Sequence, residues 1–233
     1  MRWLALALST LPFSAAAEIT GVSYVEPTTV YGHNAIEGGE YTFLRVELGD
    51  DAVMIRYDDA VFEDSAPRLV DFDMDGTPEV LTVVSEFEQG ARVQIFDLVD
   101  GAVVPVAWNA PIGTRFRWLA VAGTADFDGD GTLEIAYVDR PHLAKILRIL
   151  NVRVEDGVWS LTEVGTLDGV TNHKYRDPNI EGGIRTCDTP EVILADAKWD
   201  RIVGVTMDNG ALVARDIAAY RGADSLTRAL ACE

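Results

Sequence analysis

The sequence predicts an all-β fold: a small β-propeller or propeller-like array of about four four-stranded blades, followed by a short C-terminal helical tail. Two observations favour this class. Many short runs rich in Val and Ile alternate apolar with polar residues, and almost none has helical periodicity. An acidic motif and a hairpin turn also recur together at intervals of about 55 residues. A β-sandwich also uses many short strands, but the regular period favours the propeller.

Residues 1–17 are expected to be a signal peptide rather than part of the fold. Arg2 gives a positive start, an apolar stretch follows, and three alanines form a small-residue cleavage site before Glu18. Cleavage there predicts a periplasmic or secreted protein and, because it removes one basic residue, changes the net charge from −19 to −20. The apolar stretch is too short to span a bilayer, so we expect no membrane insertion of the mature chain.

Four units of four short strands span residues 28–216. In the last three units a two-residue turn separates two alternating runs, which is the strongest short-range signal of a β-hairpin; the turns are Asp100-Gly101, Asp156-Gly157 and Asn209-Gly210. We therefore expect a propeller domain over residues 18–216 and a tail over 217–233. A strand over 19–25 lies outside the four units and is expected to close the ring beside the last blade.

Residues 69–83 and 124–138 carry the same motif, Asp-x-Asp-x-Asp-Gly-Thr-x-Glu, at an offset of 55 residues. It places carboxylates at alternate positions of a tight loop, and its glycine permits a sharp bend. Hard oxygen ligands in a flexible loop suit Ca²⁺ better than Mg²⁺. We expect about two Ca²⁺ ions, held by Asp71, Asp73, Asp75 and Glu79 in the first loop and by Asp126, Asp128, Asp130 and Glu134 in the second, with the backbone carbonyls of Thr77 and Thr132.

An EF-hand loop begins in the same way, but two features exclude it. It needs a bidentate Glu at its twelfth position, where this chain has Thr82 and Tyr137, and it lies between helices, whereas strand-like runs flank the motif here. A weaker third copy keeps the Thr-Pro-Glu ending, with Glu191, but lacks the preceding aspartates; Arg185 and Cys187 stand in their place.

The two strong motifs resemble FG-GAP repeats, also called VCBS-type or integrin-α-like repeats. The resemblance is specific at residues 69–83 and 124–138 and weak at 180–194. It implies a β-propeller with Ca²⁺ in the loop between the first two strands of a blade, and it implies the same ligand residues in both loops. Propellers of this family often have more blades than a chain of this length can form.

The chain has two cysteines, Cys187 and Cys232. In an exported chain an even number of cysteines favours a disulfide over a metal or redox pair. Such a bridge ties the C-terminal tail back onto the domain.

A fainter repeat places a histidine before Ile-Glu-Gly-Gly twice, as His33 with Glu37 and His173 with Glu181. In a propeller these segments lie near the axis, so the four residues form a candidate axial site for a metal or a substrate. Alternatively, each His caps a turn and each Gly-Gly pair supplies a bend, which we favour because the histidines have no fixed close spacing. Nearby basic residues are either an anion-binding patch or scattered surface charge; they are Arg115, Arg117, His173, Lys174 and Arg176.

Charge and motifs together indicate a binding module. The chain has 38 acidic and 19 basic residues, which excludes nucleic acid as the main partner because phosphate binding needs a basic surface. No familiar hydrolase or metalloprotease motif is present, so an enzyme is disfavoured. We expect an exported Ca²⁺-binding propeller that binds an unidentified protein or carbohydrate ligand. The alternatives are a propeller-borne, hydrolase-like enzyme with an axial site around His33 and His173, and a structural envelope protein.

Overall fold

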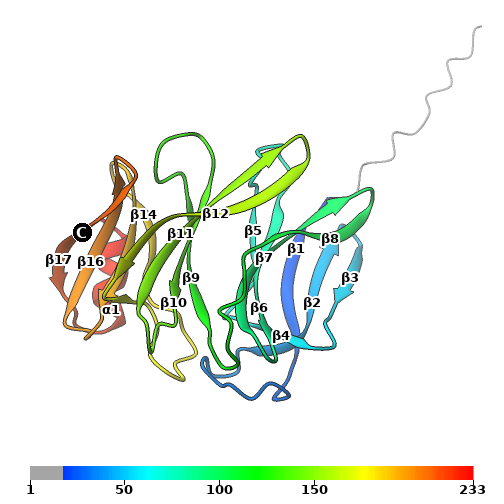
Figure 1. Ribbon diagram of the computed structural model, residues 1–233, viewed down its shortest axis with the longest axis horizontal. Coiled ribbons are helices and arrows are strands. Elements are labelled where there is room, and N and C mark those ends of the chain that lie inside the picture. Colours follow the sequence, from blue (N-terminus) through cyan, green and yellow to red (C-terminus); the bar gives the residue numbers. More distant parts are fainter. Residues whose placement is uncertain (1–17, 233) are drawn as a thin grey trace, which may run out of the picture.

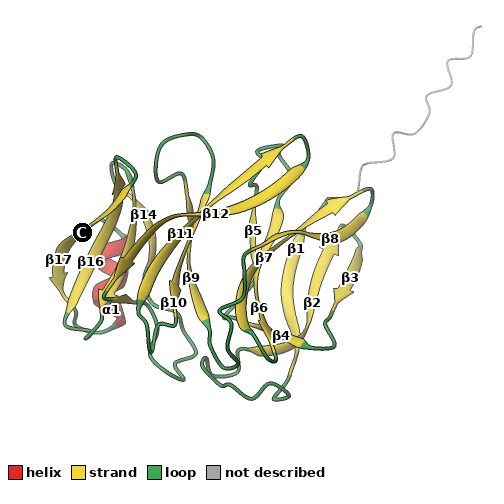
Figure 2. Ribbon diagram, viewed as in Figure 1, coloured by secondary structure: helices red, strands yellow, loops and turns green. Residues whose placement is uncertain are grey.

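The computed structural model describes residues 18–232, whose strands form three antiparallel sheets that follow one another along the long axis of the molecule (Figure 1). The described part is almost entirely strand and loop, with one short helix beside the C-terminal sheet (Figure 2). The predicted all-β class is therefore confirmed. The predicted signal peptide lies outside the described residues. Within them, no helix has the length and apolar character needed to cross a membrane.

The first sheet has eight strands. They are β1 (Gly21–Pro27), β2 (Glu40–Leu48), β3 (Asp51–Ile55), β4 (Ala60–Glu63), β5 (Arg68–Val70), β6 (Glu79–Glu86), β7 (Gly90–Val99) and β8 (Ala102–Trp108). The first predicted unit forms no sheet of its own. Because β5 is only three residues long, it pairs only with the first part of β6. The last part of the same edge of β6 pairs with β4, and β4 also pairs with β2, so the sheet continues from β6 to the N-terminal strands. Two predicted units thus share one sheet.

The N-terminal strand lies in this first sheet, and the expectation that it closes a ring beside the last blade is wrong. β1 pairs antiparallel with β2, with Tyr24 opposite Leu44. The Tyr24 ring stacks on the rings of Tyr41 and Phe62 at centroid distances of 5.3 and 5.7 Å. Aromatic packing within the first sheet therefore holds this strand at the end of the molecule opposite the C-terminus (Figure 1).

The second sheet is a four-stranded meander in the order β12-β11-β10-β9. Its strands are β9 (Leu119–Ala125), β10 (Glu134–Asp139), β11 (Ile146–Glu155) and β12 (Val158–Asp168). All three predicted hairpin turns are confirmed, and both residues of each turn have positive φ, as at Asp156 (51°) and Gly157 (75°). Turns of this kind favour Asn or Asp followed by Gly because these residues tolerate the left-handed region.

The third sheet carries the C-terminal tail. Its strands are β13 (Val170–Thr171), β14 (Gly183–Thr186), β15 (Pro190–Asp196), β16 (Arg201–Asp208) and β17 (Ala211–Ala219). The helix α1 (Ala223–Leu230) buries Leu226 and Ala229 against Ile193 and Ile202 of this sheet. The predicted disulfide is confirmed: Cys187 and Cys232 are bonded, and their Cα atoms are 6.1 Å apart.

The apolar core lies between neighbouring sheets. One buried cluster joins Val83 and Ile95 of the first sheet to Leu119 and Ile135 of the second. A second cluster joins Val138 and Leu147 of the second sheet to Val192 and Leu194 of the third, while a third cluster fills the outer part of the first sheet. The middle sheet is thus covered on both faces, as expected when each sheet depends on its neighbours to bury apolar surface.

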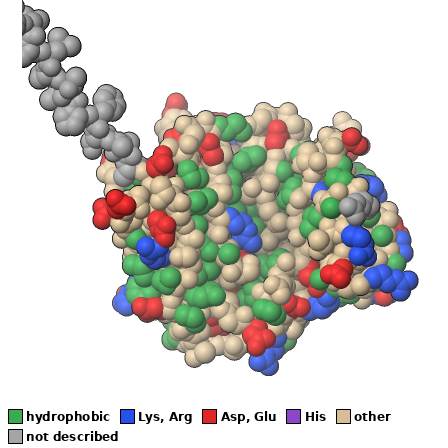
Figure 3. Space-filling view, turned by 180° about the vertical axis from the view of Figure 1, so that it is seen from behind, with side chains coloured by type: hydrophobic (Ala, Val, Ile, Leu, Met, Phe, Trp, Pro, Cys, Tyr) green, Lys and Arg blue, Asp and Glu red, His purple; other side chains and the backbone are tan. Residues whose placement is uncertain are grey.

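Charged side chains of both signs share the surface. On the face seen in Figure 3, acidic and basic residues lie next to each other, and several basic ones gather at the end that carries the C-terminus. This face has no continuous basic surface.

Candidate metal centre

Each acidic motif forms the loop that leads into a buried strand. Residues 71–78 join β5 to β6, and residues 126–133 join β9 to β10. Gly76 and Gly131 have φ values of 93° and 89°, and no atom lies near the position of an added Cβ. Glycine is therefore required by backbone conformation rather than by space, because other residues are strained in this region.

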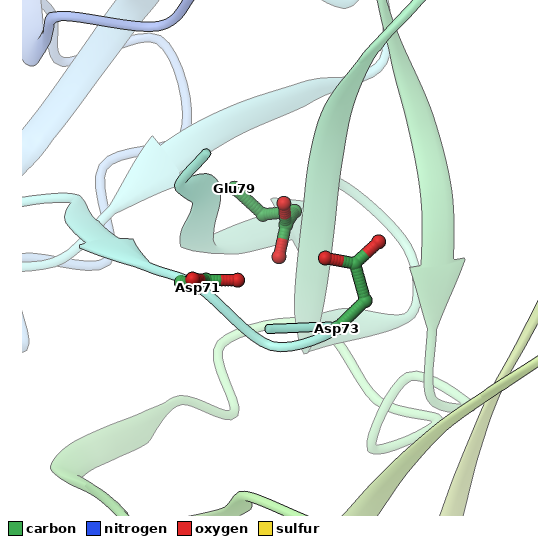
Figure 4. Close-up of side chains that lie close together, drawn as sticks. All are labelled: Asp71, Asp73 and Glu79. Atoms are coloured by element: carbon green, nitrogen blue, oxygen red, sulfur yellow. The ribbon is translucent and has the colours of Figure 1, made fainter. Parts of the chain in front are cut away.

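Three carboxylates meet in each loop. Ligand oxygens of Asp71, Asp73 and Glu79 lie within 4.8 Å of one another, and those of Asp126, Asp128 and Glu134 form a matching group. Figure 4 shows the first group: the three carboxylates point toward a common centre. Each group is therefore suited to hold one metal ion, although the geometry does not identify the metal.

The glutamate of each group is buried without a counter-charge. Glu79 is 1% exposed and Glu134 is fully buried. Each accepts one backbone N–H, from Phe72 (2.7 Å) and Phe127 (2.8 Å), and within residues 18–232 neither forms an ion pair. Burial, reinforced by nearby aspartates, raises the pKa of Glu79 to about 8 and that of Glu134 to about 7. Buried carboxylates of this kind require a cation or a proton.

An unpartnered oxygen in the first loop fits a bound cation. Oδ2 of Asp71 accepts a hydrogen bond from the Gly76 amide at 3.1 Å, but its Oδ1 is buried and has no hydrogen-bond partner. Leaving a buried acceptor unsatisfied costs free energy, and a metal ion at the carboxylate group satisfies it. The all-oxygen donor set matches the preference of hard divalent cations such as Ca²⁺.

Asp75 and Asp130 lie outside the two carboxylate groups. Oδ1 of Asp75 accepts hydrogen bonds from both the amide (2.7 Å) and the hydroxyl (2.6 Å) of Thr77, and Asp130 is held by Thr132 in the same way. The motif's aspartate and threonine therefore shape the loop. The role of these four residues as metal ligands stays a prediction.

The surroundings of the two loops differ in charge. In the second loop both oxygens of Asp126 accept backbone amides, and Arg153 pairs with Asp130 at 2.5 Å. Near the first loop Asp97 adds a negative charge that contributes to the raised pKa of Asp73 and of Glu79, after desolvation as the main cause. The first loop thus has the larger uncompensated negative charge.

The third copy of the motif neutralises its glutamate from within the protein. Glu191, which is 4% exposed, occupies the position of Glu79 and Glu134 at the start of its strand. Its Oε2 accepts hydrogen bonds from Nε and Nη2 of Arg185 at 2.8 and 2.7 Å, and its Oε1 accepts one from Nε of Arg215 at 2.7 Å. Although burial opposes ionisation, the two guanidinium groups lower the pKa of Glu191.

The histidines lie in a different place, and sequence reasoning found only two of them. His33 bonds through Nδ1 to Oε1 of the buried Glu63 at 2.9 Å, and His173 bonds through Nδ1 to Nε2 of His142 at 2.8 Å. No repeat or motif marks His142 or Glu63, so the sequence carried no signal for either residue.

The two glutamates predicted beside these histidines do not join them. Glu37 is exposed. Glu181 pairs with Lys174 at 2.5 Å and lines a separate pocket beside α1. The four-residue axial site therefore does not form as predicted.

The histidine pair predicts acid sensitivity. Burial, with the neighbouring His173 as a second cause, lowers the pKa of His142 from 6.5 to about 4. Between these values the unfolded chain binds more protons than the folded one, so this group's stabilising contribution is lost as pH falls from 6.5 toward 4. We expect the free energy of unfolding to fall by about 2 kcal/mol over this pH range. This is less than the full shift in the His142 pKa implies, because the ring is partly solvated.

Urea denaturation with saturating Ca²⁺ at a series of pH values measures this loss. Because Glu63, whose pKa is raised mainly by burial, titrates with the opposite sign, the wild type must be compared with a His142→Gln variant. Equal pH slopes for the two proteins would show that His142 is not responsible.

Comparison with known proteins supports the repeat. Residues 71–137 match the FG-GAP-like repeat family, a stretch that begins at Asp71 and contains both acidic loops. The predicted resemblance is thus confirmed for this part of the chain. No curated protein matches the chain.

Proposed function

We propose that this chain, in which residues 71–137 are an FG-GAP-like repeat, is an exported β-propeller-like interaction module with structural Ca²⁺ in its two acidic loops. Such a repeat is typical of binding modules, and the disulfide supports export because disulfides persist in oxidising compartments. The partner is a protein or a carbohydrate.

One observation carries the proposal that a divalent cation binds in each acidic loop. Three repeats place a buried glutamate at the start of a strand, and only the third supplies arginines to neutralise it. Glu79 and Glu134 instead face two further carboxylates each. A divalent ion therefore supplies at Glu79 and Glu134 the positive charge that Arg185 and Arg215 supply at Glu191.

The proposed role of the ion is structural. Glu79 and Glu134 are the first residues of β6 and β10, and both strands are almost entirely buried. An ion that joins these glutamates to the aspartates of the preceding loop fixes the entry of each strand into the core. When bound, the ion offsets part of the negative charge of the carboxylate group; the chain's own residues hold the loop shape through the Asp-Thr hydrogen bonds and the hydrogen bonds from the Gly76 and Gly131 amides to Asp71 and Asp126.

Thermal unfolding in Ca²⁺ and in chelator tests this structural role of the ion. A site whose Kd is one hundredth of the free Ca²⁺ concentration stabilises the fold by about 2.7 kcal/mol, which corresponds to about 5–10 °C for a chain of this size. We expect Mg²⁺ to give a smaller shift because it demands stricter geometry. Equal melting temperatures in Ca²⁺ and in chelator would contradict the proposal.

A further inference from the structure

Four loops meet at the edge of the sheets opposite the acidic loops. Since the second acidic loop joins the end of β9 to the start of β10, the segments before β9 (109–118) and after β10 (140–145) lie at the other edge. Segments 28–39 and 172–182 join them there: the Arg176 amide bonds to the Ala35 carbonyl at 2.8 Å (lower edge in Figure 1). We call these four segments the lower loops.

The lower loops line an open surface pocket of about 350 Å³. The side chains that line it are His33, Phe116, Arg117, His142, Leu143 and Tyr175. Although the chain has 38 acidic residues, none of the described residues that line this pocket is acidic. Arg117 gives the lining side chains a positive charge, which favours an anionic ligand.

Arg117 supplies the positive charge. Its Nη1 donates to the Phe116 carbonyl at 2.8 Å, and within residues 18–232 it forms no ion pair. The guanidinium of Arg115 lies 4.6 Å from the centre of the Phe116 ring but pairs with Glu88 at 3.4 Å, so the available charge is that of Arg117. A guanidinium with remaining N–H donors is suited to a carboxylate.

His142 supplies a hydrogen-bond acceptor. The Asp177 carbonyl can only accept, so Nε2 of His173, 2.7 Å away, carries a proton. In the neutral pair Nδ1 of His173 therefore accepts from Nε2 of His142, which leaves a lone pair on Nδ1 of His142. Among the described residues this nitrogen has no hydrogen-bond partner, so it can accept a ligand's hydroxyl.

The remaining lining residues form an exposed apolar patch. Leu143 and Tyr175 are 64% and 58% exposed, and Phe116 is 37% exposed. The Phe116 backbone has a φ of 57°, which is strained for an aromatic residue, and it is held there by a hydrogen bond from its amide to the Tyr31 hydroxyl at 2.7 Å. Strained residues and exposed apolar patches both mark binding sites, and here they coincide.

We propose that this pocket binds a small phenolic acid. Its carboxylate pairs with Arg117, and its hydroxyl donates to Nδ1 of His142. Its ring packs against Phe116, Leu143 and Tyr175. The pocket lies away from the acidic loops, so this proposal stands independently of Ca²⁺ binding.

Calorimetric titration of the full chain, saturated with Ca²⁺, tests the proposal with three probes. We expect 4-hydroxybenzoate to bind at millimolar concentration or better. Benzoate, which lacks the hydroxyl, and 4-hydroxybenzamide, which lacks the negative charge, are each expected to bind about tenfold more weakly. Equal binding of the acid and the amide, or no binding of 4-hydroxybenzoate, would overturn it.

Variants assign the contacts. Arg117→Gln should weaken 4-hydroxybenzoate about tenfold and leave 4-hydroxybenzamide unchanged, because only the acid uses the guanidinium charge. Arg176→Gln, a matched change at an exposed arginine outside the pocket lining, should change neither. Unaltered melting temperatures exclude misfolding. A loss of affinity that is equal in both variants would mean a general charge effect and would contradict the proposed pocket.

Discussion

Replacing Glu79 with Gln is expected to stabilise the metal-free protein and to destabilise the Ca²⁺-loaded protein. Without an ion, burial raises the pKa of Glu79 to about 8 against 4.5 in the unfolded chain. The stabilising contribution of this group is therefore present below pH 4.5 and lost as pH rises toward 8. At pH 7.5 the neutral amide avoids this cost; we expect the free energy of unfolding to rise by about 2 kcal/mol, less than the full pKa shift implies because solvent partly screens the loop. With Ca²⁺ the lost ligand costs about 3 kcal/mol.

Urea denaturation at pH 7.5 in chelator and in Ca²⁺ measures both effects. Glu191→Gln is the matched control, because it occupies the same repeat position but is neutralised by arginines. It should destabilise the protein equally under both conditions. A Glu79→Gln variant whose stability changes by the same amount with and without Ca²⁺ would argue against a metal at this loop.

Replacing Arg185 with Met is expected to destabilise the protein by about 3–5 kcal/mol, whether or not Ca²⁺ is present. The Arg185 side chain is 7% exposed, donates twice to Glu191 and also bonds the Ala229 carbonyl near the end of α1 at 2.5 Å. Without it, the buried Glu191 keeps only Arg215, whose side chain is 59% exposed. Denaturant unfolding measures the loss.

Two further variants separate the buried charge from lost packing. Combining Arg185→Met with Glu191→Met should recover most of the stability, because removing both charges leaves none uncompensated. Arg201→Met breaks an exposed pair with Asp216 and should change the stability far less than Arg185→Met, because solvent screens exposed ion pairs. If the double variant is as unstable as the single one, the arginine acts by packing and not by neutralising Glu191.

The sequence was informative where a few residues of restricted conformation or chemistry determine the structure. The acidic loops, the Asp-Gly and Asn-Gly turns and the disulfide each depend on a few residues of fixed conformation or chemistry, and each was predicted at the right residues. Ligation of Ca²⁺ by Asp71, Asp126 and their partners remains a prediction that the clustering of carboxylates supports.

Features that depend on distant segments were not predictable. The local sequence around Tyr24 is equally compatible with a strand at either end of the molecule. Its place beside β2 depends on long-range contacts, such as the stacking of the Tyr24 ring on Tyr41 and Phe62. In the same way, His142 meets His173 because two loops lie at one edge of the sheets, and their local sequences show no sign of it. Sheet order and pockets between loops depend on long-range packing that local patterns do not encode.

The number of bound Ca²⁺ ions tests the central claim most directly. Equilibrium dialysis or calorimetry should find two ions per chain, the tighter one in the first loop because it carries the larger uncompensated negative charge. Asp73→Asn should remove the tighter ion, Asp128→Asn the weaker one, and the double variant both; the two side chains are exposed, so the fold should persist. Absence of bound Ca²⁺, or two ions still bound by the double variant, would contradict the account.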